Sequence, residues 1–194
     1  MASVINQMDN ATRSDITRKK AIEAALVVLT KDGVGSLTFD ALSKESGISR
    51  GGLMHQFRNK DGVISALLAH QRETFDQIAA EHLKGSGAKK KEKHLSALLA
   101  IHKASASQPM SVARAVLVAL VENPQLVEEL QATHQVNMQA VKEEASDADL
   151  STLRYYAASG LAVNILLGLT KIPATTLDRL FDTLMDDERW GAMK

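Results

Sequence analysis

The sequence predicts an all-α protein of about nine helices, in which an N-terminal helix-turn-helix domain of three helices precedes a helical bundle. Apolar residues recur at helical spacing through most of the 194 residues. No segment alternates apolar and polar residues as strands do, and aromatic residues make up only 4% of the chain. Pro109, Pro124 and Pro173 stand at or near the starts of expected helices, where a missing N–H is harmless.

The first third of the chain shows an arm and three helices. Residues 1–13 are polar and carry no pattern, which predicts a flexible arm. Apolar residues at helical spacing predict a helix over 14–31, which Asp32-Gly33 ends. A second helix is expected over 38–46, with Thr38 as its N-cap and Gly47 as its end. A third short helix is expected over 49–57.

A long fourth helix and a bundle follow. Asn59 is the expected N-cap of a helix that reaches about Lys84, with Asp61 in its first turn, where the helix dipole favours a negative charge. Beyond a loop rich in Gly and Lys, helices are expected over 92–106, 109–121, 124–145, 148–171 and 174–187. We therefore divide the chain into an arm, a helix-turn-helix domain and a bundle, over 1–13, 14–60 and 61–194.

Composition excludes some classes of protein. Net charge is zero, but residues 1–60 carry nine Lys/Arg against six Asp/Glu, and the remainder carries fourteen against seventeen. A basic first third suits a module that meets phosphate. The chain has no cysteine, so it has neither disulfides nor thiolate metal sites. The apolar stretch 155–172 contains polar residues and is marginal in length for a membrane span, so we expect a buried helix, no membrane partner and a cytoplasmic location.

The segment 38–60, TFDALSKESGISRGGLMHQFRNK, has the pattern of a helix-turn-helix. Ser43 is small enough for two helices to cross, and Gly47 tolerates the left-handed backbone of the turn. Leu42, Leu53 and Phe57, together with Ile48, are placed to hold the motif to a core. Such a motif presents the N-terminal end of its second helix to the major groove of DNA.

Several residues of this motif have the chemistry to contact DNA. Arg50 can donate two hydrogen bonds to a guanine, and His55 and Gln56 can reach bases or phosphates. Glycine inside a helix costs about 1 kcal/mol relative to alanine, so the pair 51–52 suggests that the backbone must approach DNA closely. Thr38 and Lys60 lie at helix N-termini, which favour phosphate. The alternative is a plain helical hairpin in which Gly47 is an ordinary C-cap.

The stretch from Arg18 to about Leu68 resembles the DNA-binding domain of the TetR family. The features that match are Lys31-Asp32-Gly33, Leu37-Thr38, the run from Gly47 to Leu53 and the run from Phe57 to Asp61. The resemblance implies that four residues face the bases: Arg50, Gly51, Gly52 and His55. It implies that four others contact the DNA backbone: Thr38, Met54, Gln56 and Lys60. Ser49 lies at the start of the helix that would read the DNA. Family members usually carry Tyr at position 54 and His or Tyr at position 56, where this chain has Met54 and Gln56. Met54 therefore lacks a phosphate hydrogen bond worth about 1 kcal/mol.

The same resemblance implies a homodimer in which the last two helices of each chain form a four-helix bundle. Small residues among large apolar ones in 148–171 would let helices approach closely. The expected interface residues are Ala158, Gly160, Leu161, Ile165, Gly168, Leu177, Leu180, Phe181 and Leu184. The alternative is that these residues form the core of a single chain.

The middle helices are expected to enclose an apolar effector pocket with few polar groups. Helix 109–121 is apolar almost all round and so belongs inside. Arg114 within it would pair with an acidic effector or with a carboxylate of the protein itself. Tyr155 is a further polar candidate, and the expected lining is His102, Met110, Arg114, Leu117, His134, Met138, Tyr156 and Asn164. For each polar residue the alternative is a satisfied place in the core.

These features predict a transcriptional regulator that binds a double-stranded DNA operator as a homodimer. Repression is the usual mode of the family, and an unidentified small-molecule effector would change the tilt of helix 60–84. A helical dimeric interaction protein that has lost specific DNA binding is the alternative. An enzyme is not expected, because the sequence has no Gly-rich phosphate loop, nucleophile elbow or HExxH-type spacing. We expect neither a cofactor nor a metal.

Overall fold

The computed structural model describes residues 2–107 and 124–192, and over these residues it contains nine α-helices, one 3-10 helix and no strand. The prediction of an all-α fold is confirmed, although the helix expected over 109–121 lies outside the described residues. The elements are α1 Ala2–Asp32, η1 Val34–Ser36, α2 Phe39–Ser46, α3 Arg50–Phe57, α4 Lys60–Lys84, α5 Lys93–Ser105, α7 Pro124–Glu144, α8 Ala148–Leu166, α9 Ala174–Leu184 and α10 Asp187–Gly191.

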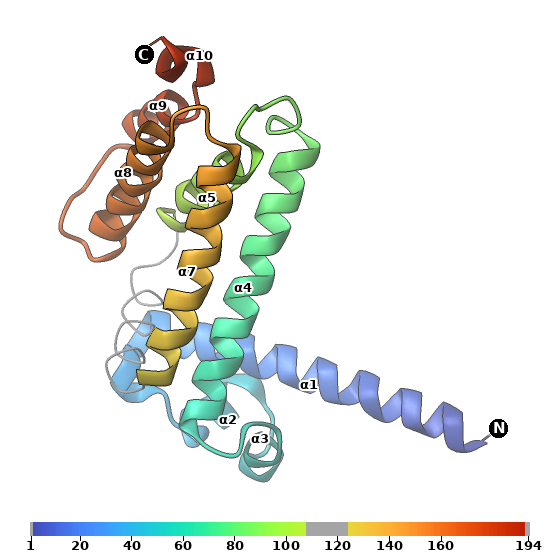
Figure 1. Cartoon of the computed structure of the whole chain (residues 1–194). Coiled ribbons are helices and arrows are strands. Elements are labelled where there is room, and N and C mark those ends of the chain that lie inside the picture. The colour runs from blue at the N-terminus through green and yellow to red at the C-terminus, as the bar shows by residue number, and fades with distance from the viewer. Residues whose placement is uncertain (1, 108–123, 193–194) are drawn as a thin grey trace.

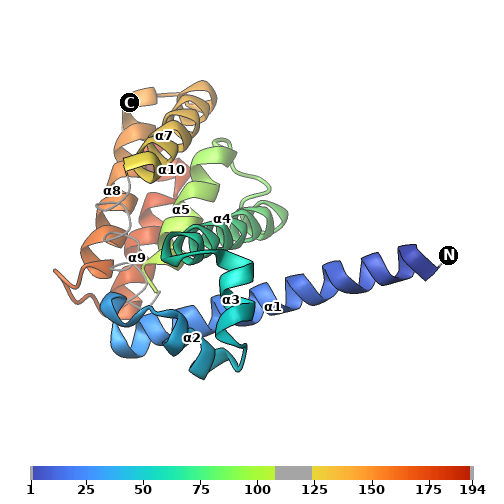
Figure 2. The same ribbon diagram turned by 90° about the horizontal axis from the view of Figure 1, so that it is seen from below.

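Figure 1 shows a small domain, built from α2, α3 and the C-terminal part of α1, at one end of a larger helical body. The long helix α4 rises from the small domain into the body and packs there against α5. The N-terminal part of α1 projects away from the rest of the molecule in both views (Figures 1 and 2). The backbone of 2–13, expected as an arm without pattern, is therefore the start of α1.

Three side chains cap the N-termini of α2, α3 and α4, close to the helix starts that the sequence predicts. Thr38 Oγ1 accepts a hydrogen bond from the Ala41 N–H at 3.1 Å, and Ser49 Oγ accepts one from the Gly52 N–H at 3.2 Å. Asn59 Oδ1 does the same for the Gly62 N–H at 2.8 Å. Each cap satisfies an N–H that the helix cannot pair itself, so these starts are fixed by local chemistry.

The core of the small domain also fixes the junction between α3 and α4. Phe57 is buried at the end of α3 and Val63 at the start of α4. Arg58 turns the chain between them with a φ of 62°, a left-handed conformation that costs a non-glycine residue energy. At Gly62 a Cβ would lie 1.9 Å from the Phe57 carbonyl oxygen, so only glycine fits. The two helices therefore interlock.

A second core holds the body together, and α4 connects it to the first. The described residues of this core lie on α5, α7, α8 and α9, or directly after α5: Leu95, Leu98, Leu99, Ala106, Met138, Val141, Tyr155, Ala158, Ala162, Phe181 and Leu184. The fully buried residues of α4, Val63 and Ala66, lie in its first two turns. Farther along, His82 Nε2 of α4 lies 2.6 Å from Ser96 Oγ of α5. The helix therefore has one end in each domain.

Two predicted helices end earlier than expected. The helix expected over 148–171 ends at Leu166, and Gly168 follows with a φ of 71°, which interrupts the helical path. The helix expected over 174–187 ends at Leu184. Asp186 then caps a new helix, α10, by accepting hydrogen bonds from the Glu188 and Arg189 N–H groups at 3.1 Å each.

A buried arginine ties the C-terminal segment to the chain before α5. The Arg154 side chain of α8 is only 4% exposed. It donates to Glu92 Oε2 at 3.1 Å, to Asp187 Oδ1 at 3.0 Å and to the Leu184 carbonyl at 2.8 Å. Ser151 donates to the same Glu92 oxygen at 2.8 Å. A desolvated charge is tolerated when it is fully paired in this way, so the network fixes how α8, α10 and residue 92 fit together.

We predict that Arg154→Met lowers the free energy of unfolding by about 3–5 kcal/mol, because it leaves the buried Glu92 carboxylate without its cation. Urea denaturation measures the change. Lys103→Met is the matched control, since Lys103 forms more exposed ion pairs with Asp178 at 3.0 Å and Asp182 at 3.3 Å, and such pairs contribute about 1 kcal/mol or less. Equal effects of the two substitutions would contradict a structural role for the buried network.

Candidate nucleic-acid interface and ligand site

The helix α3 has one face in the core and one in solvent. Leu53 and Phe57 are buried, whereas Gly51, Met54 and His55 are exposed. Met54 is 46% exposed, which leaves it free to contact a partner. The structure therefore places the predicted contact residues on an open surface at the end of the molecule farthest from α10 (Figure 1).

The two glycines at the start of α3 differ in their surroundings. A Cβ on Gly51 would meet nothing within 4 Å, so this position presents bare backbone to solvent. A Cβ on Gly52 would lie 3.2 Å from Ile48 Cγ2 and 3.3 Å from Ser49 Oγ, the capping atom. Gly51 therefore fits the expectation of an open backbone, whereas Gly52 also keeps space inside the motif.

The predicted backbone-contact positions surround this surface. Thr38 and Lys60 lie at the starts of α2 and α4, where N–H groups favour phosphate. Gln56 is partly buried, and its Oε1 accepts a hydrogen bond of 3.2 Å from Ser14 Oγ of α1. Nothing in the local sequence indicates this contact between α1 and the end of α3.

Arg50, the first residue of α3, meets a carboxylate that the sequence analysis did not single out. Its Nη1 lies 3.1 Å from Asp40 Oδ1 and 3.4 Å from Oδ2. Asp40 belongs to the first turn of α2, where a negative charge is favourable. Both side chains are more than half exposed. The guanidinium keeps other N–H groups in solvent, since arginine carries five.

A second candidate site is a cluster of four rings in the body. His102 of α5 and Tyr155 of α8 stand edge to face, with ring centroids 5.3 Å apart. His134 of α7 lies with Nδ1 3.3 Å from the Tyr155 hydroxyl and Nε2 3.1 Å from the Tyr156 hydroxyl. A phenol hydroxyl can donate or accept, so each ring nitrogen of His134 has a suitable partner. The cluster joins three helices.

Burial keeps the inner part of this cluster uncharged. It lowers the pKa of His102 from 6.5 to about 4, because an imidazolium would lose its hydration there. Burial also raises the pKa of Tyr155, with a smaller contribution from the charge of Tyr156. His102 and Tyr155 therefore present an imidazole and a hydroxyl without formal charge at neutral pH.

The structure brings together only part of the predicted effector lining. His102, His134 and Tyr156 meet in the ring cluster, and Met138 is buried in the surrounding core. Asn164 is exposed and donates to the Gly160 carbonyl of its own helix at 2.7 Å, so it is not part of the cluster. Tyr155, considered only as a further candidate, is central to the cluster. Three predicted lining residues lie outside the described residues: Met110, Arg114 and Leu117.

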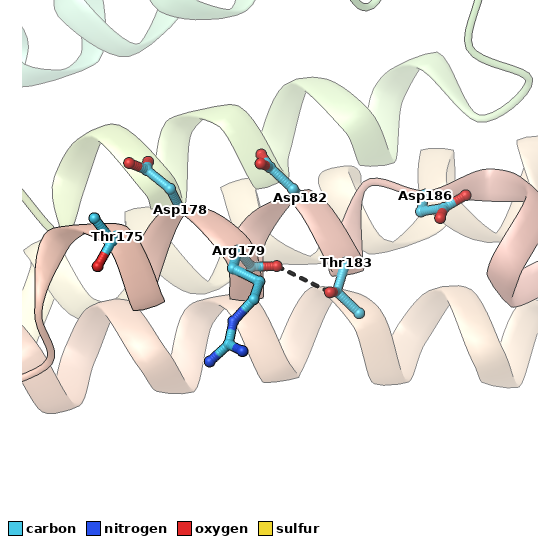
Figure 3. Close-up of a pocket in the computed structure, with 6 residues that line it drawn as sticks. All are labelled: Thr175, Asp178, Arg179, Asp182, Thr183 and Asp186. Atoms are coloured by element: carbon cyan, nitrogen blue, oxygen red, sulfur yellow. Dashed lines mark hydrogen bonds between the residues drawn. The ribbon is translucent and has the colours of Figure 1, made fainter.

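An open groove on α9 differs from this cluster in composition. Figure 3 shows the groove, which has a volume of about 480 Å³ and is lined by Thr175, Asp178, Arg179, Asp182, Thr183 and Asp186. Asp178 and Asp182 already bind Lys103 of α5. Arg179 points away from these two carboxylates in Figure 3. The lining is polar and contains none of the residues predicted for the effector.

The structure divides the residues predicted for the dimer interface. Ala158, Phe181 and Leu184 are buried within the chain itself, so for these three the alternative of an intramolecular core is right. Helical spacing cannot show which apolar face turns inward when a helix has two. Leu161, Ile165 and Leu177 are partly buried and pack against the same core. Leu180 is partly buried, and Gly168 is exposed beyond the end of α8.

The opposite face of α8 is apolar and uncovered. Leu153, Tyr156 and Val163 are 56%, 52% and 48% exposed. Gly160, which the sequence analysis did select, lies among them and has open space where its Cβ would be. These four residues, spaced three or four apart, lie on one side of the helix. We call them the α8 outer stripe.

The described residues contain no group of three His, Cys, Asp or Glu side chains placed to hold a metal ion. None of the described helices has the length and apolar character needed to cross a membrane.

Two short helices around a left-handed glycine, with an exposed recognition helix, define a regulator of the helix-turn-helix class. Comparison with protein-family models agrees. Residues 21–67 match the bacterial regulatory proteins of the tetR family, and residues 92–187 match the tetracyclin repressor-like C-terminal domain. The chain belongs to the TetR family of transcriptional regulators.

The curated relatives resemble the chain in its first third. The transcriptional regulator SrpR of Pseudomonas putida is 32% identical over 66 residues, which are 34% of this chain and 31% of SrpR. The regulator BetI of Yersinia pestis is 26% identical over 68 residues, which are 35% of this chain and 34% of BetI. The chain therefore matches about a third of the length of these relatives.

Solved structures resemble nearly the whole chain at low identity. A TetR-family member from Streptomyces coelicolor superposes with a TM-score of 0.63 and 17% identity, covering 88% of this chain and 98% of that one. The multidrug binding protein EbrR in complex with ethidium gives a TM-score of 0.60 and 17% identity, covering 87% and 97%. These likenesses confirm the expected fold, an N-terminal helix-turn-helix with a helical bundle.

We predict that acid destabilises the fold through His102. Its pKa is about 4 in the folded chain and 6.5 otherwise, so between these values the unfolded chain binds more protons and the free energy of unfolding falls as pH falls. The loss attributable to His102 reaches roughly 3 kcal/mol at the lower pH. Urea denaturation at several pH values measures it.

His102→Phe is the matched variant, because it keeps a ring edge against Tyr155 and removes the titration. The free energy of unfolding of this variant should fall less at low pH, by the amount attributed to His102. Some loss of stability at low pH should remain in the variant because of His82, whose pKa is lowered by burial and by the charge of Lys90. Parallel stability profiles of the variant and the parent protein would show that His102 is hydrated in solution.

Proposed function

We propose that the chain is a dimeric repressor whose α3 helices read an operator in duplex DNA and whose release is controlled by a small molecule. The observation that carries this proposal is the surface around α3. Arg50 donors, the bare backbone of Gly51 and the helix starts at Thr38 and Lys60 share one exposed end of the molecule. The major groove offers base acceptors to Arg50 and room for the backbone of Gly51, and the phosphates that flank the groove lie within reach of helix starts such as Thr38 and Lys60. An operator in DNA also places the site of action in the cytoplasm.

The expected pairing of two chains uses the α8 outer stripe. The helix α8 is apolar on its buried face and again at Leu153, Tyr156 and Val163. A helix that is apolar all round is normally covered all round. Gly160 at the middle of the stripe lets a second helix approach closely. We therefore assign the pairing surface to this stripe rather than to Phe181 and Leu184.

The effector is proposed to bind beside the ring cluster of His102, His134, Tyr155 and Tyr156. The cluster is uncharged at its centre and bordered by apolar residues of α5, α7 and α8. This chemistry suits a mainly apolar molecule with a few groups that form hydrogen bonds. The multidrug binding protein EbrR, which has a similar fold, was solved in complex with ethidium.

The proposed signal travels through α5 and α4. The helix α5 carries His102 and packs on α4, to which the His82–Ser96 contact joins it. Because the start of α4 interlocks with Phe57, a tilt of α4 carries α3 with it. A ligand favours release only to the extent that it binds one orientation of α4 better than the other.

For DNA binding we predict different effects of two substitutions on the duplexes that the protein selects from a randomised pool. Arg50→Ala should lose about 1–3 kcal/mol of discrimination at one base pair of each half-site. Lys60→Ala should weaken all sequences alike and reduce the dependence of log affinity on log salt by about one unit. Mobility-shift titrations at several salt concentrations measure both. A parent protein that enriches no sequence would favour the alternative, a helical interaction protein without specific DNA binding.

For pairing we predict that Val163→Glu converts the dimer to a monomer, because it places a charge on the α8 outer stripe, at its C-terminal end. Val136→Glu on α7 is the matched control, since Val136 is 69% exposed and lies outside that stripe. Sedimentation equilibrium measures the mass of each variant. A Val163→Glu protein that stays dimeric would move the pairing surface elsewhere.

A further inference from the structure

The ion pair between Asp40 and Arg50 stands on the surface that is proposed to meet DNA. It joins the first turn of α2 to the first residue of α3, with Nη1 3.1 Å and 3.4 Å from the two carboxylate oxygens. The two side chains are 74% and 62% exposed. Exposed pairs of this kind add little to stability. The first turn of α2 favours a negative charge at Asp40, but this preference does not require the bond to Arg50.

The carboxylate also has an electrostatic cost for the proposed function. DNA binding depends on cations that neutralise phosphate charges, and a negative group at the interface opposes that attraction. A second effect has the opposite consequence. An arginine side chain is long and has many rotamers, and without a partner it can contact the nearest phosphate as readily as a base. Asp40 restricts this freedom.

The geometry of the pair leaves the arginine able to read a base. Asp40 occupies only Nη1, and a guanidinium carries further N–H donors on Nη2 and Nε. Guanine offers two acceptors, O6 and N7, side by side in the major groove, and a bidentate arginine matches them. The bond to Asp40 therefore fixes the guanidinium while its remaining edge is free.

Resting on the proposed function, we propose that Asp40 is a positioning residue that directs Arg50 toward a guanine and away from the DNA backbone. The residue contributes to the choice of sequence, and it lowers the affinity for DNA of any sequence. Its expected signature is a variant that binds DNA more tightly overall but chooses its sites less well.

The test compares Asp40→Asn with Glu45→Gln. Both substitutions remove one negative charge from α2, and Glu45 belongs to a different exposed pair, with Lys31 at 3.7 Å. Duplexes are first selected from a randomised pool with the parent protein, and Arg50→Ala identifies the base pair that Arg50 reads. Affinities are then measured for the selected duplex, for the duplex with that base pair exchanged, and for unrelated duplex DNA.

We expect Asp40→Asn to reduce discrimination at that base pair by about tenfold, which is within the range of a bidentate contact. Affinity for unrelated DNA should rise several-fold, as for Glu45→Gln, which should keep full discrimination. In an Arg50→Ala background, Asp40→Asn should change discrimination no further, because its effect passes through Arg50. Thermal melting checks that each variant folds like the parent protein.

Two results would overturn the inference while leaving the proposed function intact. In one, Asp40→Asn still distinguishes the selected duplex from the exchanged duplex as well as the parent protein does, although Arg50→Ala does not distinguish them. The other is a further loss when Asp40→Asn is added to Arg50→Ala, which would mean that Asp40 contacts the base itself. A parent protein that selects no duplex would instead overturn the proposed function and this inference together.

Discussion

The close contact between the end of α3 and the start of α4 is the constraint on which the rest of the molecule depends. Phe57 anchors α3 in the first core, Arg58 reverses the chain, and Gly62 lets α4 begin against the Phe57 carbonyl. Any larger residue at position 62 would push the two helices apart. The recognition helix therefore has no independent orientation, and its direction is that of the first turns of α4.

This contact also determines how the two separate cores are connected. One core surrounds α1, α2, α3 and the first turns of α4, and the other surrounds α5, α7, α8 and α9. The buried residues of α4 belong to the first core, and the helix packs against α5 in the body, where His82 contacts Ser96. Because α4 contacts both parts, a change in its tilt against α5 would also move the helix-turn-helix domain.

The features that local chemistry determines could be predicted from the sequence, and those that depend on tertiary pairing could not. Thr38, Ser49 and Asn59 cap helices a few residues away, so their positions mark helix starts directly. The bond from Arg50 to Asp40 and the meeting of His134 with two tyrosines need the packed structure. The network of Arg154 with Glu92 and Asp187 likewise joins residues that are far apart in the sequence. The periodicity of α8 shows that the helix is apolar, but not that Ala158 faces inward while Val163 faces outward.

The uncovered stripe on α8 has a consequence for how abundant the protein must be. Each separate chain leaves Leu153, Tyr156 and Val163 in water, and any process that covers them stabilises the native state by mass action. Thermal stability should then rise with concentration. If the chains pair through this stripe as proposed, newly made chains in a cell with few copies stay exposed to proteases for longer. The number of paired molecules then rises faster than the rate of synthesis.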